Sequence, residues 1–482
     1  MTEKHKKTIP SLRRLTALVL LALLLPTPAA RAEAETPPES RGYLVLFSEE
    51  LTPPDMAGEL EQVVPGVCRT EDLELALSLQ RSGLAERVEP NYTVTLFDTG
   101  TEAEPKEDWS WRAMGGERAA DLGLDGSGVR IGLIDSGIQA DNPNLAGAQI
   151  LPGYDFVRNT REMCDTVGHG TEVAQVLAGA GDGGVRGLAP GAELVPLRCF
   201  SEKTGGIDGI IRALWAAVDE YGCQVVNMSF GLPKSSESQA LRNAVAHADE
   251  AGAVLVASAG NVGAYAQGTV LYPAAYPQVV GVGALTSGGE LARVSMCTEA
   301  VYVCAPGETI WFRDLSGSRV SASGTSFSSP YIAGIAALLL QLAPRMRCEE
   351  LRELLAARAE DLGEPGYDIL YGYGAVSVDG LLSSPWLRAL REGRQISLDG
   401  WDFAGSPGCL IAADYAEGGR MSGCATLRHG AGLVSLALDL PSAVHRGAGE
   451  LRLYWLGEDL VPKGPVETVE VRETEYPAAP ST

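Results

Sequence analysis

The sequence predicts an α/β fold: a parallel sheet with helices on both faces, preceded by a small α+β segment and followed by a β-rich segment. Short runs of apolar residues without polar alternation are typical of strands that are buried on both faces. Helical stretches separate these runs, and that alternation favours a parallel sheet. The expected strands are 129–134, 193–197, 225–228, 254–257 and 279–282, and the expected helices are 171–177, 209–221 and 238–251.

The first residues are expected to form an export signal, residues 1–32. Five basic side chains precede an apolar run at 15–25, and Ala30-Arg31-Ala32 offers a cleavage site. The run of 11 residues from 15 to 25 is too short to span a bilayer comfortably. We therefore expect a secreted, extracellular protein that keeps no transmembrane anchor once the signal is removed.

Three further parts are expected: a small α+β segment at 33–106, a main domain at 107–383 and a β-rich domain at 384–482. In the first part, 42–47 and 93–97 are predicted strands, and 71–81 is a predicted helix opened by Thr70. An acidic, turn-rich linker at 98–108 follows and is a natural cutting point. In the last part, alternating runs at 396–398, 433–440 and 451–456 indicate strands, but the sequence does not reveal their role.

Charge and cysteine content exclude some classes of function. The 482 residues carry a net charge of −24, which argues against binding a phosphate backbone. No Cys-x-x-Cys pair occurs and only five histidines are present, so no metal site is expected. Nine cysteines in an exported chain permit disulfides, although several can equally be buried thiols. Cys409 and Cys424 could clip a hairpin in the last domain.

A small-residue turn at 323–330 leads into an apolar segment at 331–342, which Pro344 ends. Without a polar face this helix must be buried all round. A hydroxyl in its first turn lies where unpaired N–H groups and the helix dipole favour developing negative charge. Ser326 is therefore a candidate nucleophile. The alternative is that Thr325 or Ser326 merely caps the helix.

Other residues at element boundaries complete a catalytic set. Asp135 ends the first predicted strand, where open α/β sheets bind ligands. His169 opens a helix between two glycines, and Asn261 follows the strand 254–257 on a glycine-bordered loop. A serine nucleophile needs an imidazole to take its proton, a carboxylate to orient the imidazole and a donor for the oxyanion. The chain order Asp, His, Ser is one known order of this triad.

With these motifs the chain resembles the subtilisin-like serine proteases, the subtilases, from Trp109 to about Leu382. The resemblance implies the subtilisin fold, with Asp135 as orienting acid, His169 as general base and Ser326 as nucleophile. The matching motifs are Gly-Leu-Ile-Asp-Ser-Gly-Ile at 132–138, Gly-His-Gly-Thr at 168–171, Asn-Met-Ser-Phe-Gly at 227–231, Ser-Ala-Gly-Asn at 258–261 and Gly-Thr-Ser-Phe-Ser-Ser-Pro at 324–330.

The resemblance also implies the binding sites and the partners. Asn261 would form the oxyanion hole together with the backbone N–H of Ser326. The segment 33–106 would be an inhibitory propeptide that is removed autocatalytically, and 107–383 the catalytic domain. The partners would be protein or peptide substrates, and the propeptide as the chain's own inhibitor. The residues implied to bind substrate are Ser229, Phe230, Gly231, Ser258, Ala259, Gly260 and Leu271. Because Leu271 and Val262 are uncharged, we expect an apolar residue before the cut, with Leu or Met preferred to the largest aromatics.

Some positions depart from the family's pattern. Glu172 and Tyr331 replace histidines that are common in the family but are not triad members. The family's usual calcium loop is shortened here, at 180–184, and Asn144 stands where an aspartate ligand often occurs. A hard dication needs six to eight oxygens. No cofactor is therefore expected to be required, and a calcium ion remains only an alternative.

Competing functions fit the sequence less well. A catalytically dead protease-like adhesion or scaffold protein would need a broken triad, and each of the three residues is present. A lipase or esterase would need Gly-x-Ser-x-Gly around the nucleophile with the histidine last. Gly126-Ser127-Gly128 precedes a strand, whereas a dinucleotide fingerprint follows one.

Overall fold

The structure is a computed structural model that describes residues 40–48, 59–96, 99–100, 108–261, 271–392, 395–403, 408–416, 420–429, 432–439, 450–457, 467–469 and 471–473. The predicted export signal, Val262 and most of the predicted linker lie outside these ranges.

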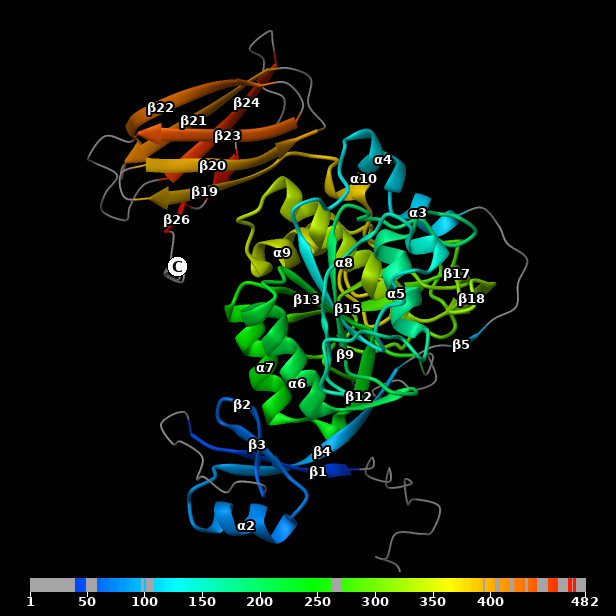
Figure 1. Ribbon diagram of the computed structural model, residues 1–482. Helices are drawn as coiled ribbons and strands as arrows, with labels where there is room; N and C mark the ends of the chain where they lie inside the picture. Colours follow the sequence, from blue (N-terminus) through cyan, green and yellow to red (C-terminus); the bar gives the residue numbers. More distant parts are fainter. Residues whose placement is uncertain are drawn as a thin grey trace, which may run out of the picture. The chain divides into compact units, whose positions relative to one another are not determined.

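A parallel sheet forms the centre of the main domain, with strand order β16-β15-β13-β11-β6-β9-β7, and β8 also pairs with β9 (Figure 1). This confirms the predicted α/β class. The strands are β6 (Arg130–Asp135), β7 (Gln149–Ile150), β8 (Tyr154–Asp155), β9 (Glu193–Arg198), β11 (Val225–Met228), β13 (Val254–Ser258), β15 (Val279–Leu285) and β16 (Val303–Pro306).

Helices cover both faces of this sheet. In β13, Val254 and Val256 enter one apolar cluster, while Leu255 and Ala257 enter the other. Because successive side chains of a strand point to opposite faces, the sheet is buried on both sides. The first cluster contains α5 (His169–Ala178), α8 (Thr325–Leu342), α9 (Cys348–Arg358) and α10 (Val378–Leu381), and the second contains α6 (Ile207–Trp215) and α7 (Gln239–Glu250). The end of the predicted helix 209–221 is a separate π-helical turn, Ala216–Glu220.

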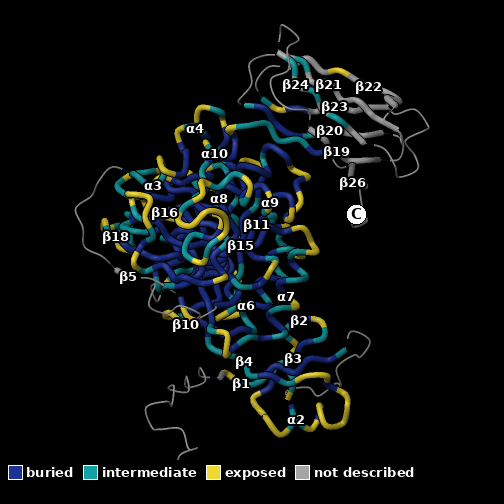
Figure 2. The backbone as a smooth tube through the Cα atoms, turned by 180° about the vertical axis from the view of Figure 1, so that it is seen from behind, coloured by how far each residue is buried: buried dark blue, intermediate teal, exposed yellow. Residues whose placement is uncertain are grey.

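Helix α8 lies in the first cluster, as its lack of a polar face requires. Within the described residues it is the one helix long and apolar enough to cross a membrane, but 94% of it is buried inside the protein (Figure 2). It is therefore the core helix of the main domain. Short helices α3 (Trp109–Ala113) and α4 (Gly116–Asp121) precede the sheet.

The segment before the main domain is a small antiparallel α+β unit. Its elements are β1 (Ser40–Leu46), β2 (Glu61–Val64), β3 (Val67–Thr70), α2 (Leu73–Arg81) and β4 (Arg87–Leu96). Asp72, and not the predicted Thr70, caps α2, since its carboxylate accepts the N–H of Leu75. Further strands of the chain are β5 (Thr99–Gly100), β10 (Thr204–Gly206), β12 (Phe230–Pro233), β14 (Leu271–Tyr272), β17 (Ile310–Arg313) and β18 (Arg319–Ser323).

The last part of the chain forms two four-stranded sheets, β23-β20-β19-β26 and β22-β21-β24-β25. Trp401 is fully buried and belongs to the same cluster as α8, and Arg388 pairs with Glu350 of α9. The strands are β19 (Trp386–Glu392), β20 (Gln395–Asp402), β21 (Gly408–Ala416), β22 (Arg420–His429), β23 (Gly432–Asp439), β24 (Glu450–Gly457), β25 (Glu467–Val469) and β26 (Val471–Glu473).

The register of this domain corrects the expected hairpin clip. Cys409 lies opposite Arg428, and Cys424 lies opposite Ala413. The two cysteines are therefore offset by four positions, or about 13 Å along the strands, which is too far for a disulfide. All cysteines whose side chains are described are free thiols.

Candidate active site

Each predicted triad residue lies at the boundary of an element of the main domain. Asp135 is the last residue of β6, His169 the first residue of α5 and Ser326 the second residue of α8. The carboxyl end of β6 lies between those of β9 and β11, where an open sheet of this type binds ligands.

The structure brings Asp135 and His169 into direct contact. Nδ1 of His169 lies 2.8 Å from Oδ1 of Asp135 and 3.0 Å from Oδ2, and both side chains are 1% exposed. The N–H of Ser136 donates to Oδ1 at 2.7 Å. These contacts fix the carboxylate in a dry site and leave Nε2 as the ring nitrogen for proton exchange.

A buried cation supports the same corner of the site. Arg198 lies directly opposite Asp135 on β9, and its guanidinium donates to the carbonyl of Ser136, to Asp155 and to Thr166 Oγ1. Burial alone would raise the pKa of Asp155, but hydrogen bonds from Arg158 and Arg198 outweigh it and lower the pKa. The anion therefore stays charged and compensates Arg198.

Ser326 lies in the first turn of α8. Its Oγ donates to the carbonyl of Ser229 at 3.2 Å. The ring of the next residue, Phe327, lies with its centroid 5.9 Å from the His169 ring and 4.6 Å from Phe312. Packing of Phe327 thus fixes the start of α8 beside the imidazole.

Asn261 reaches the same helix start from the loop after β13. Its Oδ1 accepts hydrogen bonds from the N–H and the hydroxyl of Thr325, each at 2.8 Å. Its Nδ2 is buried and has no hydrogen-bond partner in the part of the chain that the structure describes. A fixed, dry donor of this kind can stabilise an oxyanion.

The predicted substrate-binding residues border one another. Ser229 joins β11 to β12, which contains Phe230 and Gly231. Strand β12 pairs with β14, and Pro233 of β12 lies opposite Leu271 of β14. Ser258 ends β13, and Ala259 and Gly260 follow it. A methyl group added at Gly260 would overlap both Leu271 Cδ1 and Met296 Sδ, so Leu271 packs against the 258–260 segment.

One strand of the N-terminal unit pairs with this substrate-binding segment. The end of β4 pairs with β12, with Leu96 opposite Phe230 and Thr95 opposite Gly231, and also with β10. Along β4, Val94 and Leu96 are buried and Thr95 is exposed. Beyond the gap at 97–98, β5 pairs with β18, where Thr99 faces Ser323.

Two polar residues of β4 cap helices of the main domain. Glu89 accepts hydrogen bonds from the hydroxyl of Ser238 and from the N–H groups of Gln239 and Ala240, at the start of α7. Asn91 accepts the N–H of Asp208 at the start of α6. A carboxylate at a helix N-terminus is favoured by the unpaired N–H groups and by the helix dipole.

The sequence reasoning missed Asp165 and Arg198. Asp165 accepts N–H groups of Gly168 and Thr171 beside His169, and Arg198 donates to Ser136 beside Asp135, but no local motif distinguishes either residue from a surface charge. The sequence gives one indication for Arg198: it ends a largely apolar strand, and a charged residue that is buried there needs a partner.

The position of the family's calcium loop is occupied by a hydrogen-bonded amide network. Nδ2 of Asn144 donates to Gln175 Oε1 and to the carbonyl of Val185, while its Oδ1 accepts the N–H groups of Gly181 and Asp182. Arg313 donates to the carbonyl of Asp182. Among the described residues, no group of three or more His, Cys, Asp or Glu side chains could hold a metal ion.

Comparison with known proteins gives a consistent result. Residues 126–374 match the Subtilase family. The chain is 36% identical to subtilisin DY of Bacillus licheniformis over 261 residues, and this alignment covers 53% of this chain and 92% of the relative. It is 30% identical over 377 residues to a thermostable alkaline protease of Halalkalibacterium halodurans, covering 76% and 97%. It is 33% identical over 326 residues to the minor extracellular protease Epr of Bacillus subtilis, covering 65% and 49%.

Proposed function

Because the chain belongs to the subtilase family and is a serine endopeptidase, we propose that it hydrolyses peptide bonds through Asp135, His169 and Ser326. The observation that carries this assignment is the buried hydrogen bond between Asp135, at the carboxyl end of β6, and His169, together with the place of Ser326 in the first turn of α8. Like the minor extracellular protease Epr of Bacillus subtilis, it would act outside the cell, after removal of an export signal at 1–32.

In the proposed reaction, Nε2 of His169 takes the proton of Ser326 as Oγ attacks the substrate carbonyl. Asp135 holds Nδ1–H and stabilises the imidazolium that forms. The oxyanion accepts hydrogen bonds from Nδ2 of Asn261 and from the N–H of Ser326. His169 then donates its proton to the leaving amine, and water hydrolyses the acyl-enzyme by the same steps in reverse.

The substrate would bind as an extra strand along Phe230 and Gly231. The contacts of β4 support this, since it already pairs with β12 on one side and β10 on the other. The N-terminal unit would thus act as an inhibitor that fills the groove. Its caps on α6 and α7 support a role in folding as well.

We also propose that the enzyme cuts its own chain between Leu96 and Thr99. Leu96 is held opposite Phe230, and Thr99 opposite Ser323, so the two anchored ends flank Ser326. The described end of β4 runs along β12 toward Ser229, whose carbonyl accepts the Ser326 hydroxyl, and this favours the bond between residues 97 and 98. The propeptide would then end at residue 97, before the boundary of 106 expected from composition.

The residue before this cut would be Phe97, although the sequence predicts a pocket that prefers Leu or Met. An intramolecular cut tolerates this, because Val94 and Leu96 already anchor the strand and proximity replaces pocket affinity.

The Asn144 network does not fit a hard dication. The Asn144 amide N–H and the Arg313 guanidinium donate to the carbonyl oxygens of Val185 and Asp182, so these oxygens already have donors where a dication would need free ligands. We infer that hydrogen bonds hold this loop without calcium.

Labelling and processing together test the proposal. A serine-directed phosphonylating reagent should modify Ser326, and Ser326→Ala should abolish hydrolysis and leave the precursor uncut. Mass spectrometry of the wild-type product should give a mature chain that begins at residue 98. Normal maturation of Ser326→Ala expressed alone would contradict self-processing, and a label on another residue would contradict the assigned nucleophile.

A further inference from the structure

The turn that leads into His169 is held by one carboxylate, that of Asp165. Oδ1 accepts the N–H groups of Val167 and Gly168, each at 2.9 Å. Oδ2 accepts the N–H of Thr171 at 3.0 Å and its hydroxyl at 2.6 Å. Four donors on both sides of His169 therefore converge on one anion.

This arrangement compensates for a missing helix cap. The N-cap residue of α5 is Gly168, with a left-handed φ of 100° and no side chain to accept the first N–H groups. Asp165 reaches the third helical residue, Thr171, from outside the helix. The contact thus anchors the first turn of α5, which carries His169.

The same network joins the base to the acid. The hydroxyl of Thr171, which donates to Asp165, accepts the N–H of Gln139 at 3.0 Å. One residue earlier in α5, the N–H of Gly170 donates to Ser136 Oγ at 2.9 Å. Asp165 thus fixes the segment after His169 against the segment after Asp135.

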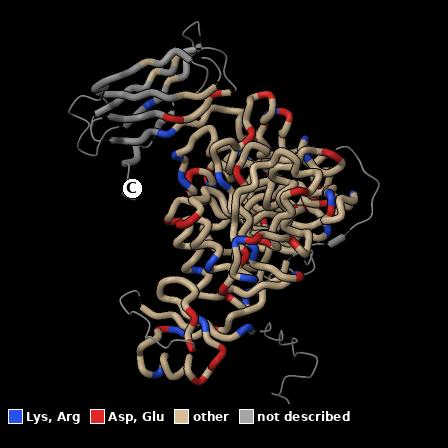
Figure 3. Tube along the Cα trace, viewed as in Figure 1, with Lys and Arg blue, Asp and Glu red and all other residues tan. Residues whose placement is uncertain are grey.

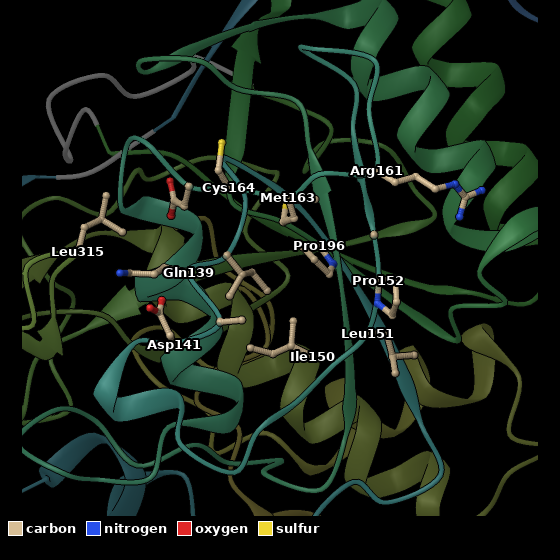
Figure 4. A pocket seen from close by; sticks show the side chains of 14 residues that line it. Gln139, Asp141, Ile150, Leu151, Pro152, Arg161, Met163, Cys164, Pro196 and Leu315 are labelled. Atoms are coloured by element: carbon tan, nitrogen blue, oxygen red, sulfur yellow. The ribbon is translucent and has the colours of Figure 1, made fainter.

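A pocket of about 580 Å³ lies on one side of this turn. Figure 4 shows Met163 and Cys164 on its wall, together with Gln139 and Leu315, and Asp165 also lines it. On the other side His169, Gly170 and Thr171 are buried in the protein. The Asp165 carboxylate therefore lies between the pocket and the buried start of α5.

We propose that Asp165 is a positioning residue of the protease reaction, which acts through Thr171 to hold His169 in line between Asp135 and Ser326. This inference rests on the proposed role of His169 as the general base. Asp165 itself touches no reacting atom. Its removal should therefore slow turnover and leave substrate binding intact, because a small misplacement of a catalytic group can reduce rates about 100-fold.

The test uses Asp165→Asn and the pair Thr171→Val and Thr171→Ser in the full chain. Asp165→Asn keeps the shape of the side chain but turns an N–H group toward one set of donors. Thr171→Val removes the bridging hydroxyl, whereas Thr171→Ser retains it. The control is Asp125→Asn, because Asp125 accepts the N–H of Ser127 in a turn before β6, at the opposite end of that strand from Asp135.

Rates are measured on a small peptide substrate per active site titrated with the phosphonylating reagent. Precursors that mature slowly are processed with a trace of wild-type enzyme, and a Ser326→Ala precursor treated alike gives the blank. We expect kcat to fall about 10- to 100-fold for Asp165→Asn and Thr171→Val with KM unchanged. Thr171→Ser and Asp125→Asn should retain kcat within about twofold.

Proton NMR gives a second readout, the far-downfield signal of His169 Nδ1–H bonded to Asp135. It should weaken or shift in Asp165→Asn and persist in Asp125→Asn. Wild-type kcat in Asp165→Asn, or equal losses in Thr171→Ser and Thr171→Val, would overturn the inference. An active His169→Ala would instead overturn the proposed function, whereas a fully active Asp165→Asn beside an inactive His169→Ala would overturn the positioning role alone.

Discussion

Asn261 allows catalysis and ground-state structure to be tested separately, because its two polar atoms have different partners. Oδ1 accepts two hydrogen bonds from Thr325 in the resting enzyme, whereas the buried Nδ2 has no partner among the described residues. Asn261→Ala removes both functions. Asn261→Asp retains the acceptor and replaces the donor with an anionic oxygen.

The magnitudes follow from these contacts. Loss of one oxyanion-hole donor lowers kcat about 10²–10³-fold, or about 2.7–4 kcal/mol of transition-state stabilisation, a range measured for the corresponding donor of a subtilisin. Loss of the acceptor leaves buried donors of Thr325 unpaired, which costs about 1–3 kcal/mol of folding stability. Asn261→Ala should therefore show both losses. Asn261→Asp should lose at least as much kcat but less stability.

The assay combines peptide hydrolysis with thermal unfolding. Steady-state rates give kcat and KM for each variant, and unfolding is followed in a Ser326→Ala background so that no chain digests another. For both variants KM should stay within about threefold of the wild-type value. A large rise in KM with kcat unchanged would refute the assignment, since Asn261 would then stabilise substrate and transition state equally.

Three further predictions concern the Asn144 loop, Leu271 and Glu89. The wild-type enzyme should keep its activity in a calcium chelator. The Asn144→Asp variant should be less stable than the wild type, and a chelator should reduce its activity. Rapid inactivation of the wild type by the chelator would show that a strong ion site exists. Leu271→Gly should raise kcat/KM for Phe or Tyr before the cut by about tenfold, because it deepens the pocket, and a peptide library that instead selects Lys or Arg would contradict an apolar pocket. Glu89→Ala should shorten the lag between self-cleavage and activity. The N-terminal unit loses three hydrogen bonds to the start of α7 and should leave the enzyme sooner. An unchanged lag would contradict the proposal that these contacts hold the inhibitor in place.

Figure 3 shows that positions of Lys and Arg are interspersed with positions of Asp and Glu along the described part of the chain.

The sequence by itself determined the sheet, the core helix and the identity of the candidate triad. Strands such as β11 and helices such as α8 are read from local apolar patterns, because burial on both faces requires an uninterrupted apolar run. Asp135, His169 and Ser326 stand in short motifs at the ends of such elements, where the chemistry demands those residue types.

Only the tertiary structure decided which distant segments meet. The pairing of Leu96 with Phe230 joins residues more than one hundred positions apart. Only two residue pairs connect β4 to β12 and three connect it to β10, and such short pairings carry little register information of their own. The offset of Cys409 from Cys424 and the burial of Trp401 beside α8 depend in the same way on contacts between elements. Asp165 is identified only by the four donors that surround it, because an isolated aspartate in a polar turn resembles any surface charge until the chain has folded.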